Sequence, residues 1–444
     1  MKNRTPLTLL WLAALTLFVP GTLFSGARAT EPVDDRTVTD AYIYLLGRYL
    51  VIRQEKIDQD LTKAGYNTIK YNPLGKAEFV NPNMDVAYLE AWLAVDEKTP
   101  ALLTVPKISA RYYTVEIIDE WGNIISNINP RETPATPYGN FVFLLRGTSP
   151  PLPKGATAIE LPSKKAKLLA RIALQSTPSE AVKLQYDFKL RSLGKPTIAP
   201  PPAFPVFTNS KLIGVEIFDN VEQVLAGAVD RMPNASQWQD KVRTVAAAVA
   251  SSPEERKRIA AVLKAKSIPA FFEMTRGFGT QKGGWSVVYT IGDYGDRFDL
   301  RTIGSYLSIW ANTAREVIHF SGNKDANGYG LSGNHRYTIH FPKEQLPTDF
   351  ANAFWSLTVL TLPDYRVVPN RLKRYSINSF MKFQSESDGS LRLTLAAEPP
   401  PGVADTNWLP SQRGRDITLT LRLYLPKEPV LNGTWFAPPI EKKN

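Results

Sequence analysis

Residues 417–424 read ITLTLRLY, a stretch in which core-forming aliphatic side chains alternate with other types. Because successive side chains of a β-strand point to opposite faces, this pattern predicts a strand with one face in a core and the other in water. Residues 336–341 and 391–395 repeat the alternation, and residues 354–362 form a longer apolar run. Strands of this kind separated by turn residues are typical of β-sandwiches. We therefore expect a jelly-roll-like β domain over residues 321–444.

The residues before this domain have the period of helices. Apolar side chains recur at helical spacing in residues 219–232, 236–250 and 300–320, which predicts amphipathic helices. The sequence Ser252-Pro253-Glu254-Glu255 starts a further helix, because Ser can cap it and Pro is tolerated at its first position. Residues 207–320 are therefore expected to form a helical connecting region.

A proline-rich segment precedes the helical region. Residues 195–206 contain five prolines, which excludes a helix or a central strand because Pro lacks a backbone N–H. This segment is either a linker or a strap laid over the surface. Residues 30–194 are expected to form an N-terminal helix, at 37–64, followed by a β domain that ends in a helix at 177–193. The predicted fold is thus α+β and β-rich, with two jelly-roll-like β-sandwich domains and helices at the N-terminus and between them.

The first 29 residues have the pattern of a secretory signal peptide. Lys2 and Arg4 precede an apolar run at residues 7–18, and Ala27-Arg28-Ala29 resembles a cleavage site. The run is too short to span a bilayer comfortably. We expect cleavage after residue 29, no membrane span in the product, and a soluble protein in the periplasm or outside the cell; an uncleaved anchor is the alternative.

Composition excludes several classes of protein. The chain has no Cys, which rules out a thiol nucleophile and a Cys-ligated metal centre. The net charge is +11, but the Lys and Arg residues are dispersed. A nucleic-acid-binding protein would gather them on one element beside stacking aromatic side chains, so we expect no nucleic-acid partner.

Several phrases resemble known families. The sequence of residues 80–88, VNPNMDVAY, resembles the signature of the domain-of-unknown-function family 1254, and Arg111-Tyr112-Tyr113 resembles its following strand. The C-terminal third is similar to family 1214, for example at Phe354-Trp355-Ser356 and at Asn407-Trp408-Leu409-Pro410. The resemblance implies two jelly-roll-like β domains and no settled activity. The chain departs from the first signature at Val86, where the family has Thr.

A polar cluster in the N-terminal β domain is the candidate ligand site. Asn81, Asn83 and Asp85 alternate, so they share one face if the segment is extended. Arg111 and Tyr113 share a face of another strand, and Arg111 is expected to lie near Asp85. These five residues could bind a small molecule, or they could brace the structure through turns and an ion pair.

We therefore expect an exported protein of unsettled function that binds a small polar or glycan-like ligand in a cleft of the β domains. The alternative is a periplasmic enzyme with hydrolase-like or lyase-like chemistry on a small organic or glycan-like substrate. Its general acid or base would be Asp85 or Asp119.

No metal or other cofactor is expected. His335 and His340 are predicted to lie on opposite faces of one strand, and His319 is predicted to close a helix, so the three histidines do not converge. Residues 323–328, NKDANG, resemble the start of a calcium loop, but position 12 is Asn334 rather than Glu. A polar turn is the favoured interpretation. Four C-terminal aromatic residues could stack on a sugar or fill the core: Trp355, Trp408, Tyr424 and Trp435.

Overall fold

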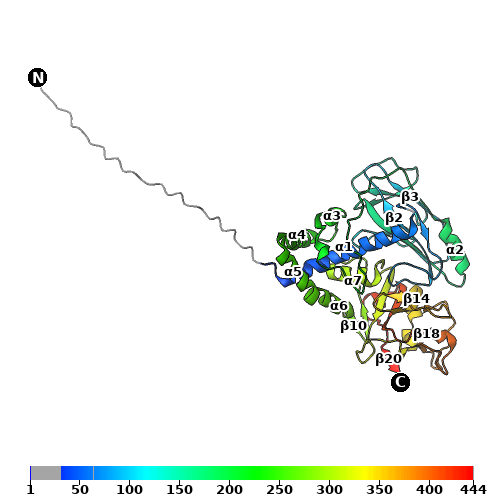
Figure 1. Cartoon of the computed structure of the whole chain (residues 1–444). Helices are drawn as coiled ribbons and strands as arrows, with labels where there is room; N and C mark the ends of the chain where they lie inside the picture. Colours follow the sequence, from blue (N-terminus) through cyan, green and yellow to red (C-terminus); the bar gives the residue numbers. More distant parts are fainter. Residues whose placement is uncertain (2–31, 64, 444) are drawn as a thin grey trace. The chain divides into compact units, whose positions relative to one another are not determined.

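The computed structural model describes residue 1, residues 32–63 and residues 65–443. Apart from Met1, the predicted signal peptide lies outside the described residues, and so does its cleavage site. Val33–Asn444 form one compact unit, an α+β assembly rich in β-strands (Figure 1). No helix in the described part of the chain has the length and apolarity needed to cross a membrane.

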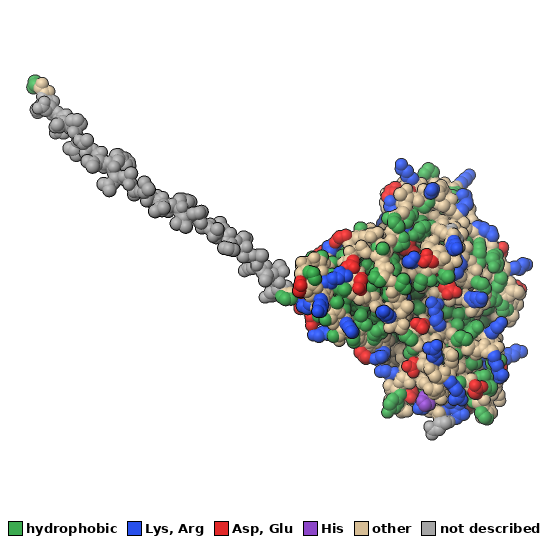
Figure 2. Space-filling view, viewed as in Figure 1, with side chains coloured by type: hydrophobic (Ala, Val, Ile, Leu, Met, Phe, Trp, Pro, Cys, Tyr) green, Lys and Arg blue, Asp and Glu red, His purple; other side chains and the backbone are tan. Residues whose placement is uncertain are grey.

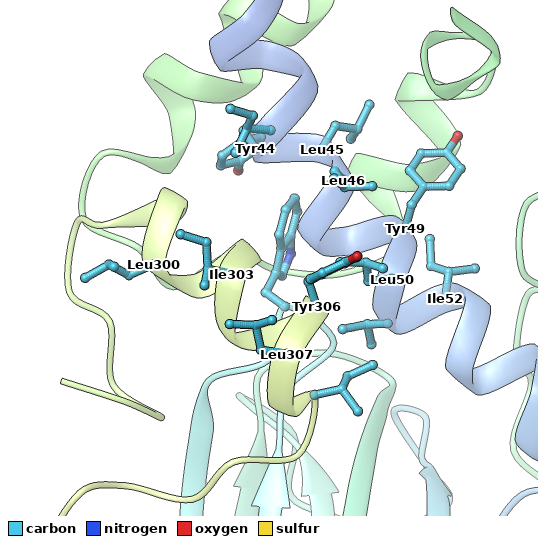
Figure 3. Close-up of a cluster of buried hydrophobic side chains, with 14 of the residues drawn as sticks. Tyr44, Leu45, Leu46, Tyr49, Leu50, Ile52, Leu300, Ile303, Tyr306 and Leu307 are labelled. Atoms are coloured by element: carbon cyan, nitrogen blue, oxygen red, sulfur yellow. The ribbon is translucent and has the colours of Figure 1, made fainter. Parts of the chain in front are cut away.

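Helix α1 (Asp35–Thr62) is the central helix of the unit. It begins at Asp35 rather than at the predicted Thr37, because the Asp34 carboxylate accepts the backbone N–H groups of Arg36 and Thr37 at 3.0 Å. Its middle is buried on all sides, from Ala41 to Ile52. Figure 3 shows Leu46 and Leu50 of α1 beside Ile303 and Leu307 of helix α7 (Phe298–Ser308).

The chain after α1 forms two mainly antiparallel sheets. They enclose a core of aliphatic and aromatic side chains. The first sheet has the order β1 (Lys70–Tyr71), β2 (Val86–Ala94), β8 (Lys165–Ala173), β4 (Tyr113–Ile118), β5 (Ile124–Ile128). The second has the order β7 (Thr157–Leu161), β6 (Gly139–Leu145), β3 (Ala101–Val105), β9 (Lys189–Ser192).

The helical middle of the chain packs around α1. Helix α2 (Pro178–Asp187) is shorter than predicted, because the chain after Phe188 pairs with β3 as strand β9. Residues 195–206 form no helix or strand. The Phe204 ring in this segment lies 5.5 Å from the Tyr49 ring of α1. The remaining helices of this region are α3 (Val221–Ala226), α4 (Ala235–Ser251), α5 (Pro253–Val262) and α6 (Ile268–Arg276).

The C-terminal part contains two further sheets around a second core, in which Trp355 and Leu421 are fully buried. The larger sheet has the order β10 (Thr280–Lys282), β11 (Trp285–Val287), β12 (Val317–Gly322), β19 (Ile417–Pro426), β14 (Ala351–Thr361), β15 (Arg366–Val367), with β16 (Ser376–Asn378) also paired to β14. The smaller has the order β18 (Trp408–Pro410), β17 (Leu391–Ala396), β13 (Arg336–Phe341), β20 (Ile440–Lys443). The two sheets pack in a sandwich-like arrangement. The predicted jelly-roll topology of the strands stays a prediction.

Two expectations about this region are wrong. The helix predicted to Phe320 ends at Ser308, and Val317–Gly322 form strand β12, which pairs with β19. His319 therefore lies on a strand rather than at a helix end. The residues of β19 that were expected to face water are buried, including Thr420 at 2 % and Arg422 at 1 % exposed. The second face of β19 is covered by residues distant in sequence, and these contacts create the candidate site.

Candidate functional site

The polar face of β19 meets residues 79–85, which we call the junction segment. Nη2 of Arg422 donates to the backbone carbonyl oxygen of Asn81 at 2.7 Å, and Thr420 Oγ1 donates to Asn81 Oδ1 at 3.1 Å. Asn81 Nδ2 donates to Ser308 Oγ at 2.7 Å. Asn81 has a positive φ of 53°, a conformation that Asn tolerates better than most residues. Asn81 thus joins the junction segment to both β19 and α7.

Asn83 and Asp85 continue this junction toward β14 and β16. Asn83 Nδ2 donates to the Tyr424 hydroxyl at 2.8 Å. Asp85 Oδ1 accepts from Ser376 at 2.7 Å and from Asn378 at 2.8 Å, and Oδ2 accepts from Ser356. Asp85 is only 7 % exposed. The segment is not an extended strand, and the side chains of all three residues make contacts with the C-terminal sheet.

The side chains of Arg111 and Tyr113 make contacts different from those of Asp85. The Arg111 guanidinium donates to the carbonyl oxygens of Ala173 and Leu174 and pairs with Glu180 at 3.0 Å. It forms no ion pair with Asp85, so the expected pairing of these two is wrong: the acceptors of Arg111 lie at the end of β8, whereas Asp85 faces β14 and β16. The Tyr113 hydroxyl donates to the Pro137 carbonyl oxygen at 2.6 Å.

The second candidate carboxylate, Asp119, closes the turn between β4 and β5. Its Oδ1 accepts the backbone N–H groups of Trp121 and Asn123, at 3.0 and 2.9 Å. Its Oδ2 lies 2.9 Å from Nε of Arg231. A general base must reach a substrate proton, and both oxygens of Asp119 already have donors in a residue that is 1 % exposed.

A small polar cavity lies behind the junction segment. The cavity has a volume of about 10 Å³, which is enough for one water molecule or one ion of similar size. Arg171 and Arg422 line it together with His319, and burial lowers the pKa of His319 well below its ordinary value, so its imidazole is neutral. Arg171 pairs with Glu116 at 2.6 Å, and burial raises the pKa of this carboxyl to about 7.

Two adjoining hollows form an open groove beside helix α6. One, of about 490 Å³, lies between α6, α7 and the loop after β14; the other, of about 260 Å³, lies beside the β10–β11 hairpin. Both are lined by Arg276, Asn323 and Lys324. We call the two hollows together the α6 groove. The larger hollow is also lined by three aromatic residues and one carboxylate: Phe272, Tyr306, Tyr365 and Asp416.

The loop that resembles a calcium site borders the α6 groove. Asp325 Oδ1 accepts the backbone N–H groups of Asn327 and Tyr329, at 2.9 and 3.0 Å, which closes a tight polar turn. A side chain at Gly284 would collide with the backbone carbonyl of Lys324, so glycine is needed where the hairpin meets this loop. The Tyr329 side chain is 73 % exposed.

The α6 groove is lined by charged side chains of both signs. Arg276 pairs with Glu273, whereas Lys324 forms no ion pair with any carboxylate in the described residues. On the face of the molecule seen in Figure 2, Lys and Arg side chains are scattered among acidic and apolar ones. The lining of the groove thus combines aromatic side chains with a few charged groups. This is the usual composition of a small-molecule site.

These features define an α+β protein whose two sandwich-like β regions are joined by a buried polar junction. The predicted families are confirmed: residues 66–192 match a family described as protein of unknown function (DUF1254), and residues 316–428 match one described as protein of unknown function (DUF1214). The two matches follow one another along the chain in the predicted order.

The fold is shared with a solved structure. The VPA0106 protein from Vibrio parahaemolyticus is similar over 93 % of this chain and 100 % of its own, with a TM-score of 0.64 and 22 % identity. An uncharacterised protein from Burkholderia cenocepacia is more distantly similar, with a TM-score of 0.45, 12 % identity and coverage of 94 % and 92 %. No curated protein matches the chain.

Sequence reasoning missed both the polar cavity and the α6 groove. The alternation places Arg422 in water and the helical stripe places His319 in a helix, so neither residue pointed to a shared cavity. The residues around Val317 carry a usable signal for a strand, because Val317, Ile318 and Phe320 are typical strand residues. The lining of the α6 groove comes from segments far apart in sequence and carries no local motif.

Proposed function

We propose that this chain is an exported protein that binds a small polar or glycan-like ligand in the α6 groove. The observation that carries the proposal is the combination, in adjoining hollows of about 490 and 260 Å³, of aromatic side chains with cations and a carboxylate. Concave sites with an apolar lining and few polar groups are where small molecules bind proteins. The predicted signal peptide supports export, because its charged, apolar and Ala-x-Ala parts occur in the expected order.

The chemistry of the groove favours a ligand with both hydroxyl and acidic groups. Lys324 and Arg276 can donate to carboxylate or hydroxyl oxygens, and Asp416 can accept from hydroxyls. Tyr329 is exposed and follows Gly328, which lines the smaller hollow, and precedes Gly330, which lines the larger, so we expect its ring at the rim of the groove. An exposed ring at the rim of a groove offers an apolar face to a sugar.

The enzymatic alternative through Asp85 or Asp119 gains no support from these contacts. Asp85 accepts three hydrogen bonds from neutral side chains, and Asp119 accepts two backbone N–H groups and pairs with Arg231. Each carboxylate is used by the fold, and neither lines the α6 groove.

The binding proposal is tested with neutral and acidic mono- and oligosaccharides and small organic acids, measured by calorimetry on the purified protein. We expect Tyr329→Ala and Lys324→Ala to weaken binding of the same ligand about tenfold each, the loss of about 1.4 kcal/mol. Tyr138→Ala is the control, because Tyr138 is also an exposed tyrosine, at 45 %, and does not line the groove. A ligand whose affinity is unchanged in both groove variants would refute the proposed location.

Export is tested separately by intact-mass measurement of protein recovered from the periplasm or medium. Cleavage after Ala29 predicts a new N-terminus at Thr30. Full-length protein confined to the cytoplasm would contradict this part of the proposal.

A further inference from the structure

The small polar cavity behind the junction segment lies between the two family regions. Asn81, Tyr88 and Arg171 line it from the region of residues 66–192, and His319, Arg422 and Tyr424 line it from the region of residues 316–428. Its remaining lining comes mainly from Ser308, Trp310 and Ala311. Whatever the cavity binds therefore contacts both regions.

The cavity has an excess of hydrogen-bond donors. The Tyr88 hydroxyl accepts from the Asn83 backbone N–H at 3.0 Å, and the Tyr424 hydroxyl accepts from Asn83 Nδ2 at 2.8 Å. The Ser308 hydroxyl accepts from Asn81 Nδ2 at 2.7 Å. Each of these hydroxyl groups retains its own proton to donate, and none of them donates to another group within the described residues.

Two further buried nitrogens in the lining also lack partners. Trp310 Nε1 and His319 Nδ1 are buried and make no hydrogen bond within residues 32–63 and 65–443. The Trp310 indole N–H is a donor, and leaving a buried donor without an acceptor costs about 1–3 kcal/mol. The neutral His319 ring has one N–H donor and one acceptor nitrogen. His319 as a residue is only partly buried, and it belongs to the lining of the cavity.

The cavity also carries positive charge. Arg422 is 1 % exposed and donates to Thr358 and Asn81, which are neutral. No carboxylate in the described residues forms an ion pair with it. Arg171, the second guanidinium, has a single carboxylate partner, Glu116. A buried cation without a counterion is unfavourable unless an anion accompanies it.

We propose that this cavity binds one small monovalent anion, chloride in ordinary solution. An anion supplies acceptor capacity only, which matches hydroxyl donors and guanidinium groups, whereas a water molecule would bring two donors of its own. The space admits a monatomic ion and is too small for phosphate or a carboxylic acid. The bound anion would tie the junction segment to β12 and β19, and so stabilise the assembly of the two family regions. This inference does not depend on the proposed α6 ligand.

The experiment is thermal denaturation of the mature protein in sodium chloride and in sodium gluconate at equal ionic strength. Gluconate is too large for the cavity, so it reports general salt effects alone. A ligand that binds only the folded state raises stability with the logarithm of its concentration. We expect an equal rise in Tm for each tenfold increase in chloride above its dissociation constant, and no such rise in gluconate. Equal behaviour in the two salts would overturn the proposal.

Tyr424→Phe tests the assignment of the site. This change removes one hydroxyl from the cavity and keeps the ring, which stacks on Phe354 with centroids 4.0 Å apart. We expect the chloride-dependent part of the Tm rise to shrink. Tyr113→Phe is the matched control, since its hydroxyl is bound to Pro137 away from the cavity and its chloride response should equal that of the parent protein. Tyr88→Phe serves as a second variant if Tyr424→Phe does not fold.

A crystal grown in bromide gives the decisive observation, because bromide replaces chloride and scatters anomalously. An anomalous peak between Arg422 and Arg171 is the expected result. Density in the cavity that refines as water and gives no anomalous signal would overturn the proposal.

Discussion

Lys167 is the residue whose removal should most clearly expose the energetics of this fold. It lies on β8 and is 1 % exposed. Its Nζ lies 2.7 Å from Asp58 Oδ2 of α1 and 2.6 Å from Glu90 Oε2 of β2. It belongs to a buried charge layer between α1 and the first sheet. The layer has four cations and four carboxylates: Arg48, Lys70, Lys165 and Lys167 with Glu55, Asp58, Glu90 and Glu120.

The Lys167→Met change keeps most of the apolar stem and deletes the charge. Glu90 would keep Lys70 at 3.2 Å, but Asp58 would keep only its neutral donors, Trp92 and Gln54. Removing one partner of a buried ion pair typically costs about 3–5 kcal/mol. Burial by itself would raise the pKa of Glu90, but the cations beside it, Lys167 foremost, outweigh burial and lower the pKa to about 2 against an ordinary 4.5. We therefore expect a loss of about 3–5 kcal/mol.

The assay is urea denaturation at pH 7, followed by circular dichroism and by tryptophan fluorescence. Lys164→Met is the control, because Lys164 is exposed and its partner Glu97, at 2.8 Å, is exposed as well. An exposed pair contributes about 0–1 kcal/mol. A loss below about 1 kcal/mol in Lys167→Met, equal to that of the control, would refute the view that the charge layer is a balanced buried network.

The ion pair between Lys167 and Glu90 also determines how the stability of the protein changes with pH. Because the folded-state pKa of Glu90 lies below its unfolded value, its contribution is present above pH 4.5 and is lost as the pH falls toward 2. In Lys167→Met that pKa should rise, so acid unfolding should begin at a higher pH. An unchanged acid midpoint would contradict the assignment.

Three further predictions use the same measurements. Burial raises the folded-state pKa of Glu116 to about 7, so the parent protein should lose about 3 kcal/mol as the pH rises from 4.5 through 7, and Glu116→Gln should lack this slope. Asp85→Asn should lower the free energy of unfolding at pH 7 by about 1–3 kcal/mol, because an amide cannot accept all three hydrogen bonds that the carboxylate accepts; an unchanged Tm would contradict this. Leu421→Ala in β19 should cost about 2–5 kcal/mol by opening a cavity in the core, whereas Leu372→Ala, at an exposed position, should change the midpoint little.

The parts of the fold that depend on local pattern could be predicted from sequence. The alternation at residues 417–424 identifies strand β19 correctly, because period-2 alternation specifies a strand wherever it lies in the fold. The burial of the polar face of β19 could not be predicted from the local pattern. Arg422 and Thr420 are covered by a segment more than 300 residues earlier in the chain. The end of the helix at Ser308 was missed because residues 309–320 are apolar enough to continue a helical stripe.

At the candidate site, too, the local pattern could be predicted from sequence and the long-range contacts could not. Asn81, Asn83 and Asp85 are predicted to share a face, and each of them makes at least one side-chain hydrogen bond to the C-terminal part, although Asn81 also bonds to Ser308 of α7. Period-2 reasoning finds which side chains project together, but it does not reveal what they contact. The pairing with Arg111 is wrong for this reason: β8 lies between β2, which follows Asp85, and β4, which follows Arg111, so the two strands do not pair with each other.

The junction also bears on why the two family regions occur in one chain. If residues 316–428 folded alone, they would expose Thr420, Arg422 and Tyr424 together with Ser356 and Ser376, whose partners lie in the junction segment. The junction segment would in turn leave Asp85 without the three donors that bury it. Each region has an apolar core of its own, with Leu421 in one and Leu89 in the other. Apolar packing also crosses between the regions, since the Tyr112 ring lies 5.2 Å from the Tyr424 ring, and the junction adds polar contacts that neither region can make alone. Each of these hydrogen bonds needs a partner from both regions, so the two family regions form one structural unit in this chain.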